Sequence, residues 1–212
     1  MSPDFWLEKW QTRDIAFHQT APNALLVRYF EKLHLAPANR VFLPLCGKTL
    51  DIAWLLSKGY CVAGAELSEI AVQALFLELG VKAKINPVGD LKHYAGNNID
   101  IFVGDIFDLS AAVLGRVDAS YDRAALVALP EDARRQYSRH LVQLTNSAPQ
   151  FLICFEYDQA LMVGPPFSID AREVSQQYGD VYQLSCIEKV EVAGGLKGVC
   201  PAHESAWLLL NT

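Results

Sequence analysis

Residues 40–66 constrain the fold of this chain more than any other stretch. They begin with the short apolar run Val41–Leu43, which Pro44 and Gly47 end in a turn. An apolar pattern at helical spacing follows, and a second apolar run then ends at Glu66. This order predicts a strand, a turn, a helix and a second strand with a carboxylate at its end. We therefore expect a parallel βαβ unit at the centre of the fold.

The carboxylate suggests the kind of ligand that such a unit would bind. The ligand crevice of a parallel βαβ unit lies at the carboxyl ends of its strands, where Glu66 can accept hydrogen bonds from the two hydroxyls of a ribose. The G-x-G-x-x-G pattern of a pyrophosphate site is absent, since only Gly47 lies in the turn. A nucleoside ligand without a pyrophosphate fits better, and S-adenosylmethionine is the common one. The alternative is that Glu66 is a surface acid before a helix.

Length and charge limit the possible partners. The chain has 212 residues, of which 51% are hydrophobic, and a formal net charge of −6 without any run of basic residues. This length predicts one domain, residues 1–212, with enough apolar side chains for a sizeable core. The negative charge argues against nucleic acid, because binding to phosphates depends on clustered Lys and Arg. We expect a monomer that acts on a small molecule.

The N-terminus and the cysteines predict a cytoplasmic protein. Residues 1–10 carry charges where a signal peptide needs an apolar core, and no apolar stretch approaches the ~20 residues of a membrane span. The five cysteines form no C-x-x-C pair and show no metal-binding spacing. Such cysteines indicate a reducing compartment, and no metal is expected.

Strand and helix patterns alternate through most of the chain. Helical patterns cover residues 22–33, 69–79, 130–145 and 170–178, and strand patterns cover residues 99–103, 117–121, 151–157, 182–192 and 205–210. Residues 81–98 are mixed and predict only a short strand near Lys84 and Ile85. The order predicts an α/β fold with a seven-stranded, mostly parallel sheet, helices on both faces and a C-terminal antiparallel hairpin. This is the Rossmann-like architecture of class I methyltransferases.

Residues 1–21 precede the first strand and are expected to form a lid. Phe5, Trp6 and Trp10 have helix-compatible spacing, and the irregular segment after them contains Phe17 and His18. A leading helix with no strand before it must lie across another part of the fold, and the loop is a candidate for ordering by ligand. The alternatives are a helix that docks its aromatic side chains on the core, and a histidine that packs or donates a hydrogen bond rather than acting as a general base.

Four strand ends are expected to meet at one edge of the sheet. They carry Leu45-Cys46-Gly47, Glu66, Asp105-Ile106 and Asp122-Arg123. In a class I methyltransferase the first turn lies under the methionine part of the cofactor and the second strand end holds the ribose. The third flanks the adenine, and the fourth reaches the group being transferred. The chain has a suitable residue at each of these positions.

Several of these residues also have structural interpretations. Asp105 can cap the turn that follows it, and Arg123 can pair with Asp122 or Glu131. A buried arginine is costly without a partner, so an anionic ligand explains Arg123 better. Cys46 could be a nucleophile, but no base is adjacent and direct methyl transfer needs no covalent intermediate.

Motifs along nearly the whole chain resemble those of the thiopurine S-methyltransferase family. They are Trp6 to Trp10, Ala16-Phe-His-Gln19, Val41-Phe-Leu-Pro-Leu-Cys-Gly-Lys48, Gly64-Ala-Glu-Leu-Ser-Glu69, Asp105-Ile-Phe-Asp-Leu109, Tyr121-Asp-Arg-Ala-Ala-Leu-Val127, Glu156-Tyr-Asp158 and Gly164-Pro-Pro-Phe167. The turn Pro44-Leu-Cys-Gly-Lys48 is unusual among methyltransferases and makes the match specific. The resemblance implies methyl transfer from S-adenosylmethionine to an aromatic or heterocyclic thiol. Bacterial-looking members of the family are also linked to methylation of selenium and tellurium compounds.

The resemblance also implies roles for individual residues. With Asp105 added from its strand-end position, the predicted cofactor-binding residues are Trp10, Leu45, Glu66, Asp105, Ile106 and Arg123. The predicted acceptor-binding residues are Phe17, His18 and Arg123, of which His18 is added from its place beside Phe17. The loop of residues 192–204 departs from the family pattern, since it is rich in glycine and lacks arginine. Acceptor preference is therefore the least determined property.

Three other functions are compatible with parts of this pattern. A halide or thiocyanate methyltransferase would use the same scaffold and cofactor, and only its acceptor would differ. A nicotinamide-dependent oxidoreductase would need the phosphate-binding glycines that this chain lacks. A binding module without a cofactor would show no thermal shift with S-adenosylhomocysteine.

Overall fold

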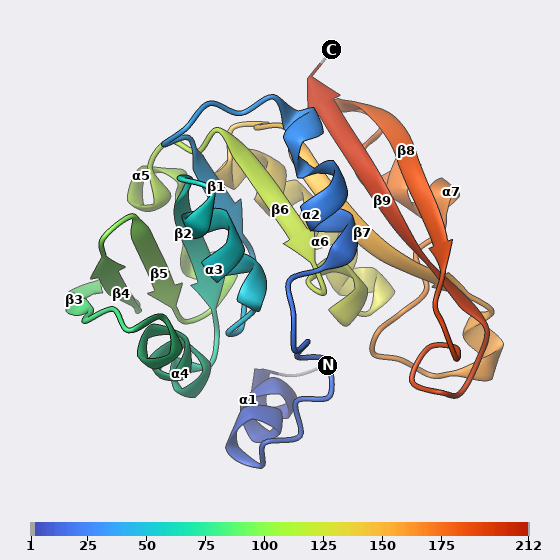
Figure 1. Cartoon of the computed structure of the whole chain (residues 1–212), viewed down its shortest axis with the longest axis horizontal. Coiled ribbons are helices and arrows are strands. Elements are labelled where there is room, and N and C mark those ends of the chain that lie inside the picture. Colours follow the sequence, from blue (N-terminus) through green and yellow to red (C-terminus); the bar gives the residue numbers. More distant parts are fainter. Residues whose placement is uncertain (1–2, 212) are drawn as a thin grey trace.

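The computed structural model describes residues 3–211 and places nine strands of this part of the chain in one sheet (Figure 1). The strands are β1 (Arg40–Leu43), β2 (Cys61–Glu66), β3 (Lys84–Val88), β4 (Leu91–Gly96), β5 (Ile99–Val103), β6 (Ala119–Arg123), β7 (Gln150–Tyr157), β8 (Tyr182–Glu191) and β9 (Ala202–Asn211). Their order across the sheet is β3-β4-β5-β2-β1-β6-β7-β9-β8. β5, β2, β1, β6 and β7 are parallel, whereas β9 runs antiparallel to both β7 and β8. The predicted α/β fold with a C-terminal antiparallel hairpin is confirmed.

Two strands extend the sheet beyond the seven that were predicted. β3 and β4 form an antiparallel hairpin, and β4 pairs with β5. Only a short strand near Lys84 and Ile85 was expected in this region. β3 is an edge strand that contains Pro87 and lies largely at the surface, so it lacks the apolar alternation of a buried strand. Gly89, with φ of 59°, makes the turn between the two strands.

Helices cover both faces of the sheet (Figure 1). One face carries α2 (Ala24–Tyr29), α3 (Leu50–Ser57) and α4 (Glu69–Leu79), and the other carries α5 (Ala111–Leu114), α6 (Glu131–Leu144) and α7 (Ala171–Tyr178). The short 3-10 helices are η1 (Phe30–Leu33), η2 (Ile106–Asp108), η3 (Leu126–Ala128) and η4 (Gln159–Leu161). Along β1, Val41 packs in the core with Ile52 of α3, whereas Phe42 packs in the opposite core with Tyr137 of α6. Because both faces are covered, the central strands read as continuous apolar runs.

Capping residues explain where α4 begins and ends and where α2 begins. Ser68 accepts a hydrogen bond from the Ala71 backbone N–H, and Gly80 ends α4 in the left-handed conformation, as the sequence predicted. The helix expected from Pro22 begins instead at Ala24. Asn23 caps it, because its side-chain oxygen accepts hydrogen bonds from two backbone N–H groups of the first turn.

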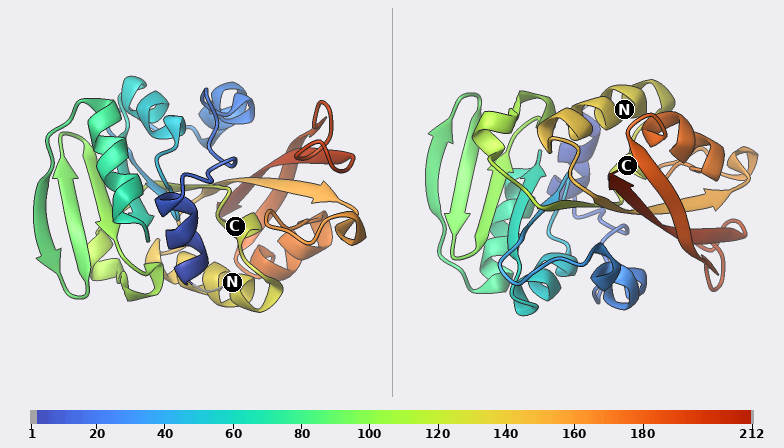
Figure 2. Two further views of the ribbon diagram at one scale, coloured as in Figure 1. Left: turned by 90° about the horizontal axis from the view of Figure 1, so that it is seen from below. Right: turned by 90° about the horizontal axis from the view of Figure 1, so that it is seen from above.

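The helix α1 (Pro3–Gln11) lies apart from the two helical layers. In Figure 1 it lies below the arrowheads of the parallel strands, and the view from below in Figure 2 shows it across the middle of that edge. Residues 1 and 2 of the predicted lid and domain, and residue 212 of the domain, lie outside the described residues. Over residues 3–211, no helix is both long enough and apolar enough to cross a membrane.

Candidate functional site

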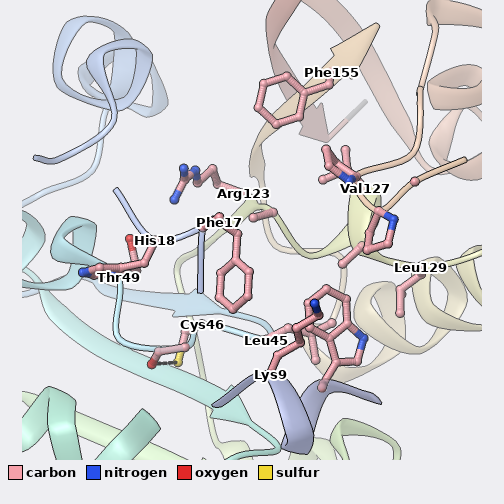
Figure 3. Close-up of a pocket in the computed structure, with 18 of the residues that line it drawn as sticks. Lys9, Phe17, His18, Leu45, Cys46, Thr49, Arg123, Val127, Leu129 and Phe155 are labelled. Carbon is pink, nitrogen blue, oxygen red and sulfur yellow. Dashed lines mark hydrogen bonds between the residues drawn. The ribbon is translucent and has the colours of Figure 1, made fainter. Parts of the chain in front are cut away.

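A cavity of about 970 Å³ lies between α1 and the carboxyl ends of the parallel strands. The loop after α1, the turns after β1, β2, β5 and β6, and parts of β7, β8 and β9 also line it (Figure 3). Every residue predicted to bind cofactor or acceptor lines this cavity, namely Trp10, Phe17, His18, Leu45, Glu66, Asp105, Ile106 and Arg123. Within residues 3–211, no three His, Cys, Asp or Glu side chains are grouped so as to hold a metal ion.

Glu66, at the end of β2, is held in place by the backbone. Its carboxylate is buried, and its two oxygens accept hydrogen bonds from the Gly47 N–H at 2.7 Å and the Ser68 N–H at 2.8 Å. Burial raises the pKa of Glu66, and these backbone hydrogen bonds oppose the increase. Each oxygen keeps further acceptor capacity, because a carboxylate has about four lone-pair sites. The group is therefore an oriented double acceptor in the cavity wall.

The turn after β1 brings backbone close to the cavity. Leu45 has φ of 46°, a left-handed conformation that is uncommon for a branched side chain and that clusters at functional sites. Gly47 has φ of 52°, and a Cβ at this position would lie 3.0 Å from the indole ring of Trp10. Trp10 of α1 is itself buried. Glycine is therefore required for the close packing of this turn against α1.

The residues after β5 combine a polar cap with an apolar wall. Asp105 is exposed in the cavity, and its carboxylate accepts a hydrogen bond from the Phe107 N–H at 3.0 Å. The capping interpretation of Asp105 is thus correct, and one of its oxygens remains available. Ile106 is buried and contributes its apolar side chain to the cavity wall.

Arg123 lies within β6 rather than after it, and its side chain enters the cavity (Figure 3). Among residues 3–211 it has no ion-pair partner and its guanidinium donates no hydrogen bond to protein. The pairing with Asp122 or Glu131 that the sequence left open is therefore wrong. Asp122 instead accepts hydrogen bonds from the Tyr137 hydroxyl at 2.7 Å and the Leu126 N–H at 3.1 Å. The guanidinium is free to bind an anionic ligand.

Replacement of Asp122 by asparagine is expected to change how stability depends on pH. Burial raises the pKa of Asp122 from 3.8 to about 6, so the folded protein holds this proton more tightly than the unfolded chain does. The stabilisation of the folded protein by proton binding at Asp122 is largest at acid pH and is lost as the pH rises through 6. Between about pH 5 and about pH 7, wild type should lose about 1 kcal/mol relative to Asp122→Asn, measured by urea unfolding. Asp90→Asn, in an exposed turn, should show no such trend. A pH-independent difference between wild type and Asp122→Asn would contradict the prediction.

Aromatic side chains close the cavity on the α1 side. The ring of Phe17 lies 5.5 Å from that of Trp10 and 5.8 Å from that of Trp6, in edge-to-face packing. Figure 3 shows Phe17 between Arg123 and Leu45, and His18 beside the turn that carries Thr49. Burial, and then the positive charge of Lys48, lowers the pKa of His18, which favours a neutral imidazole.

The environment of Cys46 does not suit a nucleophile. The thiol is buried, and it donates to the Gly47 carbonyl at 3.7 Å. Burial, followed by the nearby Glu66 carboxylate, raises the pKa of Cys46 well above its usual value. Because the thiolate is the reactive form, this environment suppresses reactivity.

Sequence reasoning missed a second set of lining residues, on the side away from β2. Val127, Leu129, Phe155, Leu196 and Glu204 line the cavity there. Lys197 donates a hydrogen bond to the Pro165 carbonyl at 2.7 Å, which ties the 192–204 loop to the Gly164-Pro-Pro turn. The sequence marked that segment as a rigid turn and as part of a family motif, without a role in the site. The feature that could have located Glu204 is the antiparallel direction of β9. The first residues of β9 lie at the edge of the sheet where the parallel strands end.

Comparisons with known proteins agree with this geometry. A family model described as thiopurine S-methyltransferase (TPMT) matches residues 1–205. A thiopurine S-methyltransferase from Xanthobacter autotrophicus is 55% identical over 210 residues, which cover 99% of each chain. One from Teredinibacter turnerae is 51% identical over 209 residues, covering 99% of this chain and 97% of the relative.

Solved structures show the same fold at much lower identity. An S-adenosylmethionine-dependent methyltransferase from Anabaena variabilis aligns with a TM-score of 0.64 and 15% identity, covering 99% of this chain and 95% of the other. The 1,6-didemethyltoxoflavin-N1-methyltransferase of Burkholderia thailandensis, determined with S-adenosylhomocysteine, aligns with a TM-score of 0.67 and 14% identity, covering 99% and 87%. The predicted class I methyltransferase fold is confirmed.

Proposed function

Because this chain belongs to the thiopurine S-methyltransferase family, we propose that it transfers the methyl group of S-adenosylmethionine to the sulfur of thiopurines and other aromatic or heterocyclic thiols. The observation that carries the proposal is the pair of groups in one cavity, a buried carboxylate with acceptor capacity at Glu66 and the guanidinium of Arg123, which has no ion-pair partner among the described residues 3–211. The first suits a ribose and the second an anionic sulfur.

The cofactor half of the site lies around the turn after β1. Glu66 would accept hydrogen bonds from the ribose hydroxyls, since its two oxygens are already oriented by the backbone. Ile106 would pack on the adenine face and Asp105 would accept from its polar edge, while Leu45 and Trp10 would enclose the methionine part. When bound, S-adenosylmethionine supplies a sulfonium methyl that is already electrophilic.

The acceptor half lies between Arg123 and the aromatic side chains. Arg123 would bind the negative charge of a thiolate, and Phe17 would pack against the acceptor ring, with His18 at its margin. Heteroaromatic thiols are acidic enough that the thiolate is accessible near neutral pH, so the site needs no dedicated general base. The site contributes by orienting the two reactants, and such alignment lowers the barrier by roughly 7–11 kcal/mol in well-oriented intramolecular reactions. A selenolate or a tellurium nucleophile would occupy the position of the sulfur.

We also infer that α1 and the loop after it act as a lid over the bound cofactor. Arg13 lies in that loop and is exposed, so trypsin should cleave there when the segment opens. At S-adenosylhomocysteine concentrations of about ten times Kd, cleavage at Arg13 should slow roughly 10-fold, as followed by mass spectrometry. Arg116, with its side chain 89% exposed and outside the cavity, is the internal control and should be cleaved at an unchanged rate. Equal cleavage at Arg13 with and without ligand would count against a lid.

The acceptor is tested with a panel of nucleophiles and mass detection of the methylated product. Thiopurines and aryl thiols should be methylated, whereas iodide and thiocyanate should react much more slowly, because the apolar walls favour an aromatic ring. Selenols belong in the same panel. Turnover of iodide or thiocyanate without turnover of any thiol would replace the proposal with a halide or thiocyanate methyltransferase.

A further inference from the structure

Glu204 lines the same cavity as Glu66 and has no role in the function described so far. It belongs to β9, which runs antiparallel to β7, so the first residues of β9 lie where the parallel strands end. Glu204 is paired with Phe155 of β7 on one side and with Val190 of β8 on the other. All three residues line the cavity. On this side of the cavity Glu204 and the exposed Glu191 of β8 are both acidic, and Glu204 is the more buried of the two.

One oxygen of Glu204 is held by the protein and the other is not. Oε1 accepts a hydrogen bond from Asn23 Nδ2 at 3.0 Å, and Asn23 is fixed because its own N–H donates to Asp51 at 2.7 Å. Among residues 3–211, Oε2 has no hydrogen-bond or ion-pair partner. Burial raises the pKa of Glu204, and the hydrogen bond from Asn23, followed by the positive charge of Arg123, opposes that increase. A largely buried carboxylate with one free oxygen is a strong acceptor that lacks a donor.

Arg123 does not supply the hydrogen-bond donor that Glu204 lacks. Both side chains line the cavity, and the charge of Arg123 acts on Glu204, but within residues 3–211 the two do not form an ion pair. The acceptor side of the site thus offers a charged donor and a charged acceptor, each available to a ligand. A ring that carries an anionic sulfur and a separate N–H would satisfy both at once.

We propose that Glu204 accepts a hydrogen bond from a ring N–H of the acceptor and thereby selects nitrogen heterocyclic thiols over plain aryl thiols. This inference rests on the proposed function and deepens it. A purine thiol retains an N–H on its imidazole ring after the sulfur has ionised, so the contact does not depend on the protonation of the sulfur. Glu204 repels the negative charge of either thiolate, but only the purine offers an N–H whose hydrogen bond offsets that repulsion, and a benzenethiolate offers none. The same carboxylate therefore favours one acceptor class and disfavours the other.

The test compares kcat/KM for 6-mercaptopurine and for benzenethiol in wild type and in Glu204→Gln, with both thiols largely ionised. The amide can keep the contact with Asn23 through its oxygen, but it places an NH₂ group where Oε2 accepted and it removes the negative charge. For 6-mercaptopurine, kcat/KM should fall about 10- to 100-fold, the usual loss for a hydrogen bond to a charged group. For benzenethiol, kcat/KM should stay the same or rise.

The opposite response of the two acceptors distinguishes recognition from a structural role. Glu156→Gln, on the neighbouring strand β7, is the matched control; Glu156 pairs with Lys189 at 2.8 Å and does not line the cavity, so both acceptors should react as in wild type. An equal loss of kcat/KM for both acceptors in Glu204→Gln, or no loss for 6-mercaptopurine, would overturn the inference and leave the proposed function intact. Failure of wild type to methylate either thiol would overturn the proposed function itself.

Discussion

Replacement of Glu66 by alanine is expected to weaken the binding of S-adenosylhomocysteine about 100-fold, or about 2.7 kcal/mol. The variant removes the proposed ribose acceptor, and a hydrogen bond to a charged group contributes about 1.5–3 kcal/mol. It also leaves the Gly47 and Ser68 N–H groups without the carboxylate that now accepts from them. The cost therefore includes disorder of the turn that approaches the cofactor. Isothermal titration calorimetry measures the affinity directly.

A nearby glutamate provides the matched control for this experiment. Glu69, three positions later in α4, accepts hydrogen bonds from Lys92 at 2.6 Å and from the Tyr94 hydroxyl at 2.7 Å, and it does not line the cavity. Glu69→Gln should bind S-adenosylhomocysteine as wild type does. If Glu66→Ala bound it with unchanged affinity, Glu66 would not be the ribose acceptor and the assignment of the cofactor half would be wrong.

The position of the residues proposed to bind the cofactor could be predicted from the sequence, because it depends on local order. A strand, a turn and a helix place the residue after each strand at the same edge of the sheet, whatever packs around it. Glu66 and Ile106 were therefore located by position alone. The fold class followed from the same alternation, since buried parallel strands read as short apolar runs between helices.

The rest of the acceptor side, beyond Phe17, His18 and Arg123, could not be predicted, because it depends on contacts between distant segments. Glu204 enters the cavity only because β9 lies beside β7, and its free oxygen is defined by Asn23, which is 181 positions earlier in the chain. The absence of an ion-pair partner for Arg123 within residues 3–211 likewise depends on the fold. In the sequence Asp122 is its nearest acid, but in the fold that carboxylate turns toward Tyr137 and Leu126. Side chains on adjacent strand positions point to opposite faces, so sequence neighbours in β6 cannot be assumed to pair.

Replacement of Arg123 by alanine is expected to lower kcat/KM for a thiopurine by about 100- to 1000-fold, comparable to the loss of a donor that stabilises charge in a transition state. Without the guanidinium, the anionic sulfur would lose its charged donor, because the lining residues Lys9, Lys48 and Lys197 are held by Asp14, Glu78 and the Pro165 carbonyl. Arg123→Lys should recover part of the loss, because it restores the charge but not the planar donor geometry. Binding of S-adenosylhomocysteine should change much less than turnover, and steady-state kinetics together with calorimetry separate the two effects.

Cys46→Ser is the variant with which the turnover of Arg123→Ala is compared. The buried Cys46 thiol has a raised pKa and donates to the Gly47 carbonyl, a contact that a serine hydroxyl can also make. If Cys46 has no covalent role, its replacement should lower kcat far less than Arg123→Ala does. A larger loss of turnover in Cys46→Ser than in Arg123→Ala would require a nucleophilic cysteine. The predicted ranking instead follows from direct transfer, because a sulfonium methyl and a thiolate need alignment and a matched charge but no intermediate on the protein.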